Sequence, residues 1–462
     1  MHFETIPRPI ADVARAEMAT YEVPGLAVGI LHGGTFYAGG FGITSVEHPL
    51  PVTPETLFQI GSTSKTVTAT VAMQLVGEGK LDLESRVRQY LPAFALRSEE
   101  DANRLTVRHL VTHHGGWQGD YFRDTGRGDD AIARIVAKMA NSPQLVAAGT
   151  AFSYNNAGFY VLAHIIETLE GEPFESVVRR RVIGPLEMHR TFYFPEDAMT
   201  HRFAAGHIRT AGGPRVARPW PVARSIAGGG GVISDVLDQL RYAAFHCGDG
   251  LTPAGARLLS EAAIRLMQTP QASAGSMCEN IGVAWMLDPT PSGHLRVKHG
   301  GATNGHLSSF EMVPGLGFAC TVLTNADSGR GPRDAVAEAA MHHFLGFRLQ
   351  TPAPSQSVGP ELADYAGRYR AALAELEVVA DGNGLRVTEH RPQRALDAGP
   401  VPLANDPVTV RVMAPDRCAI VEGPRRGERC EFLRDSDGRV AWMRWDGRLA
   451  RRIQPPEMAK RL

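Results

Sequence analysis

Residues 57–66 read Leu-Phe-Gln-Ile-Gly-Ser-Thr-Ser-Lys-Thr and place Ser62 three residues before Lys65. The apolar residues before Gly61 are typical of a strand, and the spacing after it predicts a helix that continues to Leu75. Residues three apart lie on one helix face, so the lysine amine can reach the serine hydroxyl. A desolvated lysine can take the proton of that hydroxyl, and a helix N-terminus favours a developing oxyanion. The stretch predicts a nucleophilic serine with a lysine base.

A Ser-x-x-Lys match alone is weak evidence, because roughly one is expected by chance in a chain of this length. The chain has 48 Lys plus Arg residues, of which only five are lysines. Arginine cannot act as a base at physiological pH. A lysine at this place is therefore informative, and the alternative is a solvated lysine on a helix surface.

A second motif is Tyr154-Asn155-Asn156, in a turn-like stretch before an apolar helical run over 159–166. A tyrosine beside a Ser–Lys pair can pass a proton to a leaving group, and we expect cationic neighbours to lower its pKa. Asn156 can orient a substrate carbonyl or the lysine. Taken alone, the motif fits better a half-buried tyrosine ring followed by an asparagine that caps the helix.

A third motif is Lys-His-Gly-Gly-Ala-Thr at 298–303, at the end of a strand-like run. Consecutive glycines let a substrate lie against the exposed backbone, and the N–H groups that follow can form half of an oxyanion hole. His299 can donate to a substrate carboxylate or assist the tyrosine. A lone histidine before two glycines is otherwise usually structural.

In this order, the three motifs resemble those of the serine β-lactamase and penicillin-binding-protein family. Ser62-x-x-Lys65 matches its first motif, Tyr154-x-Asn156 its second, and His299-Gly300-Gly301 its third, where the family has Lys-Thr-Gly or His-x-Gly. The resemblance covers residues from about 20 to 345. Further family-like segments lie at 105–116, 184–188 and 227–235.

The resemblance implies a serine hydrolase or acyltransferase that forms an acyl-enzyme on ester or amide bonds of small or peptide substrates. The catalytic residues it implies are Ser62, Lys65 and Tyr154. The implied substrate-binding and oxyanion-stabilising residues are Asn156, His299, Gly300, Gly301 and Ala302. The backbone N–H groups of Ser62 and Ala302 would stabilise the oxyanion.

Histidine in place of Lys-Thr-Gly argues against a dedicated β-lactamase. It indicates the branch with class C-like esterases, D-aminopeptidases, D-amino-acid amidases and peptide cyclases. A shifted match beginning at Lys298 is possible, but the residues after it suit the His299 register better. The alternatives are a penicillin-binding-protein-type peptide cyclase (thioesterase), which could take a carrier-protein-bound substrate, a β-lactamase, or a non-catalytic peptide-binding member of the fold.

Composition limits the remaining choices. The 462 residues carry a net charge of −1, which gives no basic footprint for nucleic acid. We expect no membrane span or signal peptide, because no apolar run is long enough, and therefore a cytoplasmic protein. The five cysteines are expected to be reduced and mostly buried. No cofactor is implied, and we expect no metal site, since the 17 histidines form no His-Glu-x-x-His pattern.

The predicted fold class is α+β. The resemblance implies a β-lactamase/DD-peptidase-like antiparallel sheet flanked by helices, with a helical subdomain and the active site in the cleft between them. Residues 26–37 predict two strands about a Gly-Gly hairpin, and strand patterns return over 280–325. A helix is expected over 333–347.

Three parts are expected along the chain: a catalytic domain over 1–348, a Pro/Ser linker over 349–360, and a small antiparallel β-barrel over 361–462. The barrel's opening Tyr-x-Gly-x-Tyr resembles a lipocalin-like module of some family members. The arginine-rich stretch 444–452 fits a solvated strand edge, which we favour, or a contact with the cleft. We expect the barrel to add nothing to the Ser–Lys–Tyr machinery, and either to select substrate or to form an oligomer contact.

Overall fold

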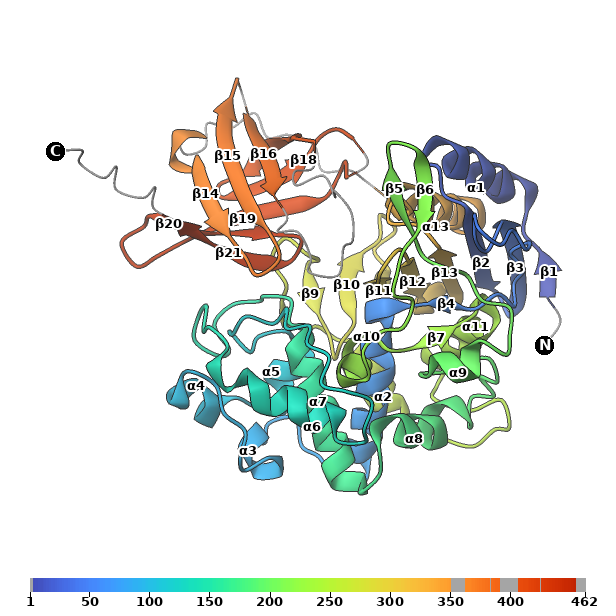
Figure 1. Cartoon of the computed structure of the whole chain (residues 1–462), viewed down its shortest axis with the longest axis horizontal. Coiled ribbons are helices and arrows are strands. Elements are labelled where there is room, and N and C mark those ends of the chain that lie inside the picture. The colour runs from blue at the N-terminus through green and yellow to red at the C-terminus, as the bar shows by residue number, and fades with distance from the viewer. Residues whose placement is uncertain (1–2, 350–361, 383, 391–405, 424, 454–462) are drawn as a thin grey trace.

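The computed structural model describes residues 3–349, 362–382, 384–390, 406–423 and 425–453. Figure 1 shows a large sheet with helices on both faces, and a separate barrel formed by the C-terminal strands. All but the first residue of the expected linker over 349–360 lies outside the described residues. No helix among the described residues is long and apolar enough to cross a membrane.

The central sheet has nine strands in the order β1-β3-β2-β13-β12-β11-β10-β9-β8. The predicted Gly-Gly hairpin is confirmed as β2 and β3. Every neighbouring pair is antiparallel except β1 and β3, so the sheet is mixed and not antiparallel throughout. A helix separates β1 from β2, so no tight turn fixes the direction of β1. The strands are β1 (Phe3–Thr5), β2 (Gly25–His32), β3 (Thr35–Gly42), β8 (Ala272–Ser273), β9 (Asn280–Ile281), β10 (Met286–Pro289), β11 (Leu295–Ala302), β12 (Leu307–Val313) and β13 (Phe318–Thr324).

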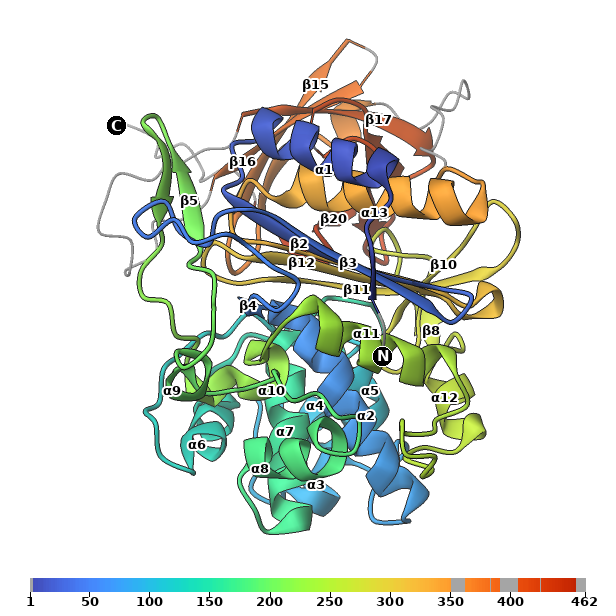
Figure 2. The same cartoon turned by 90° about the vertical axis from the view of Figure 1, so that its right-hand side faces the viewer.

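Helices cover both faces of this sheet (Figure 2). Helices α1 (Arg8–Thr20) and α13 (Arg330–Leu345) pack side by side on one face, where buried residues such as Ile10 and Val336 meet the sheet residue Phe318. Helix α11 (Val236–Cys247) lies on the other face, against β2 and β13. The helix expected over 333–347 is thus α13, which ends at Gly346 in the left-handed conformation.

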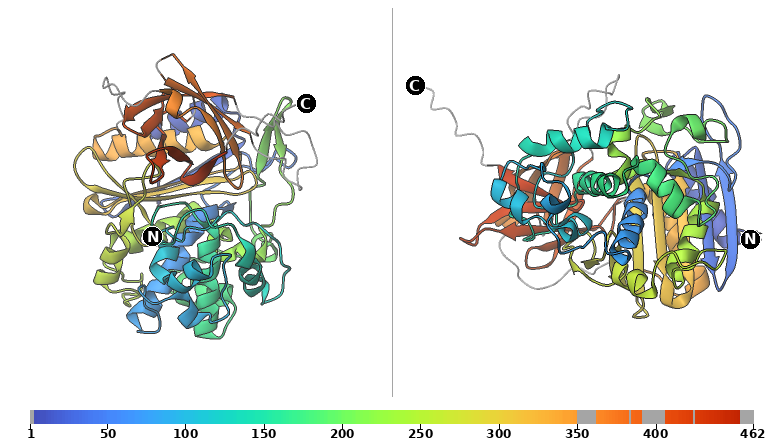
Figure 3. Two further views of the ribbon diagram at one scale, coloured as in Figure 1. Left: turned by 90° about the vertical axis from the view of Figure 1, so that its left-hand side faces the viewer. Right: turned by 90° about the horizontal axis from the view of Figure 1, so that it is seen from below.

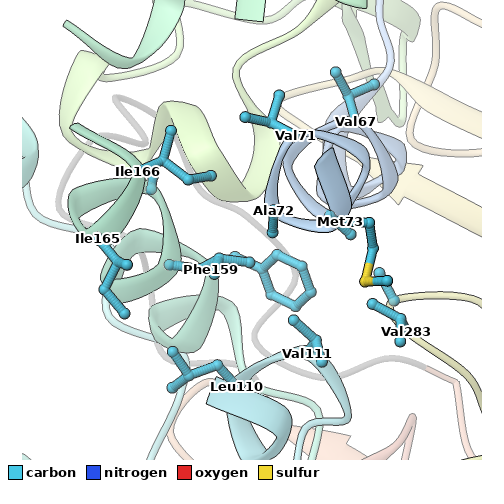
Figure 4. Packing of buried hydrophobic residues seen from close by; sticks show 14 of the residues in the cluster. Val67, Val71, Ala72, Met73, Leu110, Val111, Phe159, Ile165, Ile166 and Val283 are labelled. Atoms are coloured by element: carbon cyan, nitrogen blue, oxygen red, sulfur yellow. The ribbon is translucent and has the colours of Figure 1, made fainter. Parts of the chain in front are cut away.

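The helical subdomain lies beyond α11 and contains the helix predicted after Gly61. That helix is α2 (Ser64–Gly77), preceded by the 3₁₀ turn η1 (Gly61–Thr63), which carries Ser62. Nearly every residue of α2 is buried, as expected of a helix that is enclosed on all sides. Figure 4 shows its side chains packed toward Phe159 of α7 (Asn156–Glu170) and Val111 of α5 (Val107–Val111).

The remaining short elements complete this part of the molecule. They are α3 (Val87–Tyr90), α4 (Glu99–Arg104), α6 (Ala131–Ala137), η2 (Lys138–Asn141), α8 (Phe174–Val178), η3 (Arg179–Ile183), α9 (Pro195–Ala198), η4 (Arg224–Ile226), α10 (Ala227–Gly230), α12 (Glu261–Met267), η5 (Pro314–Leu316), and the strand pairs β4 (Phe58–Gln59) with β7 (Ile233–Ser234) and β5 (His207–Thr210) with β6 (Gly213–Val216).

The predicted antiparallel barrel is present, with eight strands closed by the pairing of β14 with β21. Its interior is filled by apolar side chains such as Tyr369, Leu385, Phe432 and Met443, so it has a packed core. The elements are η6 (Leu362–Asp364), β14 (Gly367–Arg370), β15 (Glu375–Asp381), β16 (Gly384–His390), β17 (Val408–Ala414), β18 (Arg417–Ile420), β19 (Arg429–Arg434), β20 (Val440–Trp445) and β21 (Arg448–Ile453).

The barrel meets the rest of the chain through the hairpin that joins β20 to β21 and through ion pairs such as that of Arg429 with Asp288 (2.9 Å). Figure 3 shows the barrel and the catalytic part from two further sides. The N–H of Tyr154 donates to the carbonyl of Gly447 (2.9 Å), and Arg444 Nε donates to the carbonyl of Phe152 (3.0 Å). Arg444 is 4% exposed. The solvated strand edge favoured for residues 444–452 is therefore wrong for Arg444 and Arg448, which contact the catalytic part, whereas Arg451 is exposed.

Two glycines allow η1 to approach β11. Gly61 has φ +52°, a conformation that favours glycine, and a Cβ there would lie 2.6 Å from the nitrogen of Ala302. On β11, a Cβ on Gly301 would overlap the carbonyl oxygen of Ile60. The turn that carries Ser62 is therefore held against the strand by backbone contact, with no side chain between them.

We predict that Gly301→Ala lowers the free energy of unfolding by about 3 kcal/mol, because the added methyl forces two backbones apart. The matched control is Gly300→Ala, whose Cβ would lie 3.3 Å from the nearest atom. That variant should change the free energy by no more than about 1 kcal/mol. Urea unfolding of both variants measures the difference, and equal effects would contradict the backbone contact.

Candidate active site

The three sequence motifs meet where η1, α7 and β11 come together. Ser62 lies in η1, Lys65 one turn later in α2, and Tyr154 in the loop that enters α7. His299 lies on β11, against which η1 packs. The structure therefore brings together the residues named from the sequence, although the motifs are far apart along the chain.

Lys65 is the most deeply buried of these polar groups, at 0% exposure. Its Nζ lies 3.0 Å from Ser62 Oγ, 2.6 Å from Asn156 Oδ1 and 2.6 Å from the carbonyl oxygen of Gly229 in α10. The alternative of a solvated surface lysine is therefore wrong. These three partners equal the number of hydrogens that an ammonium can donate.

The hydrogen-bonding chemistry of these partners determines where the lone pair of a neutral Lys65 amine points. The amide oxygen of Asn156 and the carbonyl of Gly229 can only accept hydrogen bonds. A neutral Lys65 keeps two N–H donors for them, and its lone pair is then left for the third partner. That partner is the hydroxyl of Ser62, which can donate its proton along the 3.0 Å contact.

Burial also favours the neutral form. It lowers the pKa of Lys65 well below its ordinary value, because the interior solvates an ammonium poorly. The positive charge of Arg448 lowers this pKa further, whereas the negative charge of Asp120 raises it. A lysine base at neutral pH needs a pKa lowered in this way.

The two asparagines of the second motif have separate positions. Asn155 is the N-cap of α7, and its Oδ1 accepts a hydrogen bond from the N–H of Gly158 (2.8 Å). The expected alternative, in which Asn156 caps the helix, is therefore wrong. Asn156 is free to contact Lys65, and its Nδ2 donates to Asp120 Oδ1 (2.6 Å).

Tyr154 lies against the rings of His113 and His299 and against the cation of Arg448. Its ring stacks on His113, with centroids 4.3 Å apart, and the guanidinium of Arg448 lies 4.8 Å from its centroid. Burial raises the pKa of Tyr154, against the opposing effects of a hydrogen bond with Ser62 and the charge of Arg448. The expectation that cationic neighbours lower this pKa overall is wrong, because desolvation dominates. Tyr154 is a protonated phenol.

His299 and Lys298 point to opposite faces of β11, as alternate residues of a strand must. Lys298 forms an ion pair with Asp288 (2.7 Å), on the face away from Val297 and His299, whose side chains are buried. The shifted match beginning at Lys298 therefore places its lysine in a structural ion pair.

The hydrogen bonding of His299 fixes what it can offer. Its Nδ1 lies 2.7 Å from the carbonyl of Gly300, which can only accept, so Nδ1 carries the proton. Burial lowers the pKa of His299 to about 3, so the ring is neutral at pH 7. Its Nε2 has no hydrogen-bond partner among the described residues and is an acceptor. The expected donation to a substrate carboxylate does not fit this state.

Three further residues contact the site, and sequence reasoning named none of them individually, although it left open a contact of the stretch 444–452 with the cleft. His113 stacks on Tyr154, Asp120 accepts from Asn156, and Arg448 lies over the Tyr154 ring. No sequence motif marks Asp120. Arg448 lies in the arginine-rich stretch, and its place could be found only once the barrel was docked.

No cluster of three or more His, Cys, Asp or Glu in the part of the chain that the structure describes could hold a metal ion. All five cysteines are free thiols, and four of them are buried.

Comparisons with known proteins find relatives that match most of this chain. The Beta-lactamase family model matches residues 10–343. "Penicillin-binding protein 4" of Amycolatopsis lactamdurans is 33% identical over 369 residues, which cover 78% of this chain and 95% of that protein. The crystal structure of SurE has a TM-score of 0.74 at 25% identity, over 96% of this chain and 98% of that one.

A second solved structure extends the likeness beyond the catalytic part. The octameric penicillin-binding protein homologue from Pyrococcus abyssi has a TM-score of 0.64 at 26% identity, over 92% of this chain and 96% of that one. The family match spans the motifs of Ser62, Tyr154 and His299. The chain therefore belongs to the Beta-lactamase family.

Proposed function

We propose that the protein is a serine hydrolase or acyltransferase that forms an acyl-enzyme at Ser62. Its substrates would be esters or amides of small molecules or peptides. The observation that carries the proposal is the buried Lys65 amine, whose two other partners can only accept hydrogen bonds. A protein that only bound its ligand would not need a buried lysine amine in contact with a serine hydroxyl.

The acylation step follows from these contacts. Lys65 takes the Ser62 proton while Oγ forms a bond to the substrate carbonyl carbon, and the carbonyl electrons move onto oxygen. The backbone N–H groups of Ser62 and Ala302 would stabilise that oxyanion. When the tetrahedral intermediate collapses, Tyr154 donates its proton to the leaving group, as its raised pKa suits. A proton from Lys65 restores the tyrosine.

Deacylation would run through the same groups in reverse. Tyr154 passes its proton to neutral Lys65 and takes one from an incoming water or amine, which attacks the acyl carbon. When the tetrahedral intermediate collapses, the bond to Ser62 Oγ breaks and Oγ takes the proton back from Lys65. Water gives hydrolysis, whereas a peptide amine gives aminolysis or cyclisation. The likeness to SurE extends over the barrel, and a SurE structure contains D-Leu, which supports including D-residues among the substrates to test.

We predict that Ser62→Ala lowers the turnover of a p-nitrophenyl ester by about a thousandfold or more. It should also abolish the fluorophosphonate adduct measured by intact-protein mass spectrometry. The matched control is Ser64→Ala, because Ser64 is buried and donates to the carbonyl of Gly61 (2.6 Å). This control should still be labelled. A wild-type protein that forms no adduct would indicate a non-catalytic peptide binder.

Lys65→Arg should lower turnover by about 100-fold or more, because arginine keeps the charge but cannot act as a base. In the wild type, activity should rise with pH along one limb as Lys65 loses its proton. The lowered pKa places that limb well below the ordinary lysine value of about 10.4. A pH–rate profile measures it. Retention of more than about a tenth of the activity in Lys65→Arg would remove lysine from the base role.

A panel of D- and L-peptide esters separates hydrolysis from aminolysis. With an ester and an added amine, we expect one acyl-enzyme to give both products, in a ratio that rises with amine concentration while the rate of acylation stays constant. Chromatography of the products measures the ratio. If the product ratio did not change with amine concentration, the protein would catalyse hydrolysis and not aminolysis.

A further inference from the structure

The C-terminal barrel contributes a charged side chain to the hydrogen bonds around Lys65. Arg448 begins β21, and its Nε donates to Asp120 Oδ2 (2.8 Å) while Nη2 lies 3.4 Å from Asp120 Oδ1. The same Asp120 Oδ1 accepts from Asn156 Nδ2 (2.6 Å), and Asn156 Oδ1 accepts from Lys65 Nζ (2.6 Å). A continuous series of hydrogen bonds therefore connects the barrel to Lys65.

This geometry leaves little freedom to Asn156. The oxygen and the NH₂ group of its amide have nearly the same shape, so only the hydrogen-bond partners determine which of them faces Lys65. Asp120 can only accept when ionised, so it fixes the NH₂ of Asn156 on its own side. The oxygen of Asn156 then faces Lys65. Arg448 in turn holds the Asp120 carboxylate by two contacts, which fixes its plane.

The alternative role for Arg448 is to bind a substrate carboxylate with two parallel hydrogen bonds. A guanidinium can make such a pair along the edge of Nε and Nη2 or along the edge of Nη1 and Nη2. Asp120 occupies the first edge, and on the second edge Nη1 donates to the carbonyl of Asp446 (2.8 Å) while Nη2 also faces Asp120. The side chain is 25% exposed and lies over the Tyr154 ring. Its contacts are therefore directed to the protein itself.

We propose that Arg448 of the barrel is a positioning residue for Lys65 that acts through Asp120 and Asn156. The barrel then completes the active site, in contrast to the expectation that it adds nothing to the machinery. The inference rests on the proposed function, because it assigns Lys65 the role of base. It goes beyond that function by making the activity depend on how the barrel is docked.

The charges around Lys65 determine in which direction a substitution should shift its pKa. The titratable or charged groups that face its amine are Tyr154 before α7, His113 after α5, His299 on β11, and the pair of Asp120 and Arg448. The two histidines are buried and neutral at pH 7, and Tyr154 is protonated. Asp120 and Arg448 are therefore the charged groups around Lys65 whose substitution should change its pKa.

The test is the pH–rate profile of kcat/KM on p-nitrophenyl acetate, which carries no carboxylate. In Arg448→Gln, the charge of Asp120 is unopposed, so the acid limb should move up by about one pH unit and kcat should fall about tenfold or more. In Asp120→Asn, the limb should move down. The double variant should return the limb toward the wild-type position, because both charges are gone.

Two further variants separate the charge of Arg448 from its two-point contact with Asp120. Arg448→Lys retains the charge without the two-point contact, so its limb should stay near that of the wild type while kcat falls. The matched control is Arg429→Gln, which removes a different barrel arginine that pairs with Asp288 of the catalytic part (2.9 Å). It should leave the limb unchanged.

The outcomes separate this proposal from the proposed function. A fluorophosphonate adduct at Ser62 in Arg448→Gln, with its limb displaced, supports both. An adduct with unmoved limbs in Arg448→Gln and Asp120→Asn would overturn the positioning role alone. A loss confined to substrates with a free carboxylate would also overturn it and make Arg448 a substrate-binding residue. If Arg448→Gln does not fold, the limbs of Asp120→Asn and Arg448→Lys decide.

Discussion

A lysine amine in an apolar interior is costly to keep charged, and its burial is tolerated only where its polar hydrogens find acceptors. Lys65 meets this condition through Asn156, Gly229 and Ser62, and each comes from a different element. The interaction therefore requires η1, α7 and α10 to converge on α2. The same burial that makes the site costly to assemble lowers the pKa of the amine, which is the property that a base needs.

The docking of the barrel is the second consequence of that burial. Asn156 can turn its oxygen toward Lys65 because Asp120 takes its NH₂, and the Asp120 carboxylate is held in place by a cation. That cation is supplied by the barrel, whose backbone also contacts Tyr154 through Gly447. The two parts of the chain are separate folds, yet the polar interior of one is satisfied by the other.

Much of the fold and site could be predicted because the signals are local. Ser62 and Lys65 are joined by helix geometry, and the barrel strands follow short alternating segments. The failures came from tertiary packing. Asp120 carries no motif, the position of Arg448 depends on how a distant strand docks, and the direction of the Tyr154 pKa depends on burial that no local pattern reveals. The parallel pairing of β1 with β3 could not be predicted either, because no tight turn connects β1 to its neighbour in the sheet.

The state of the nearby cations also bears on the substrate. Lys298 is paired with Asp288 on the opposite face of β11, and His299 is neutral with its acceptor nitrogen unpaired among the described residues. Arg448 directs its two-point edge at Asp120. An acceptor nitrogen at His299 can pair with an N–H group of a ligand but not with an ionised carboxylate, which is itself an acceptor.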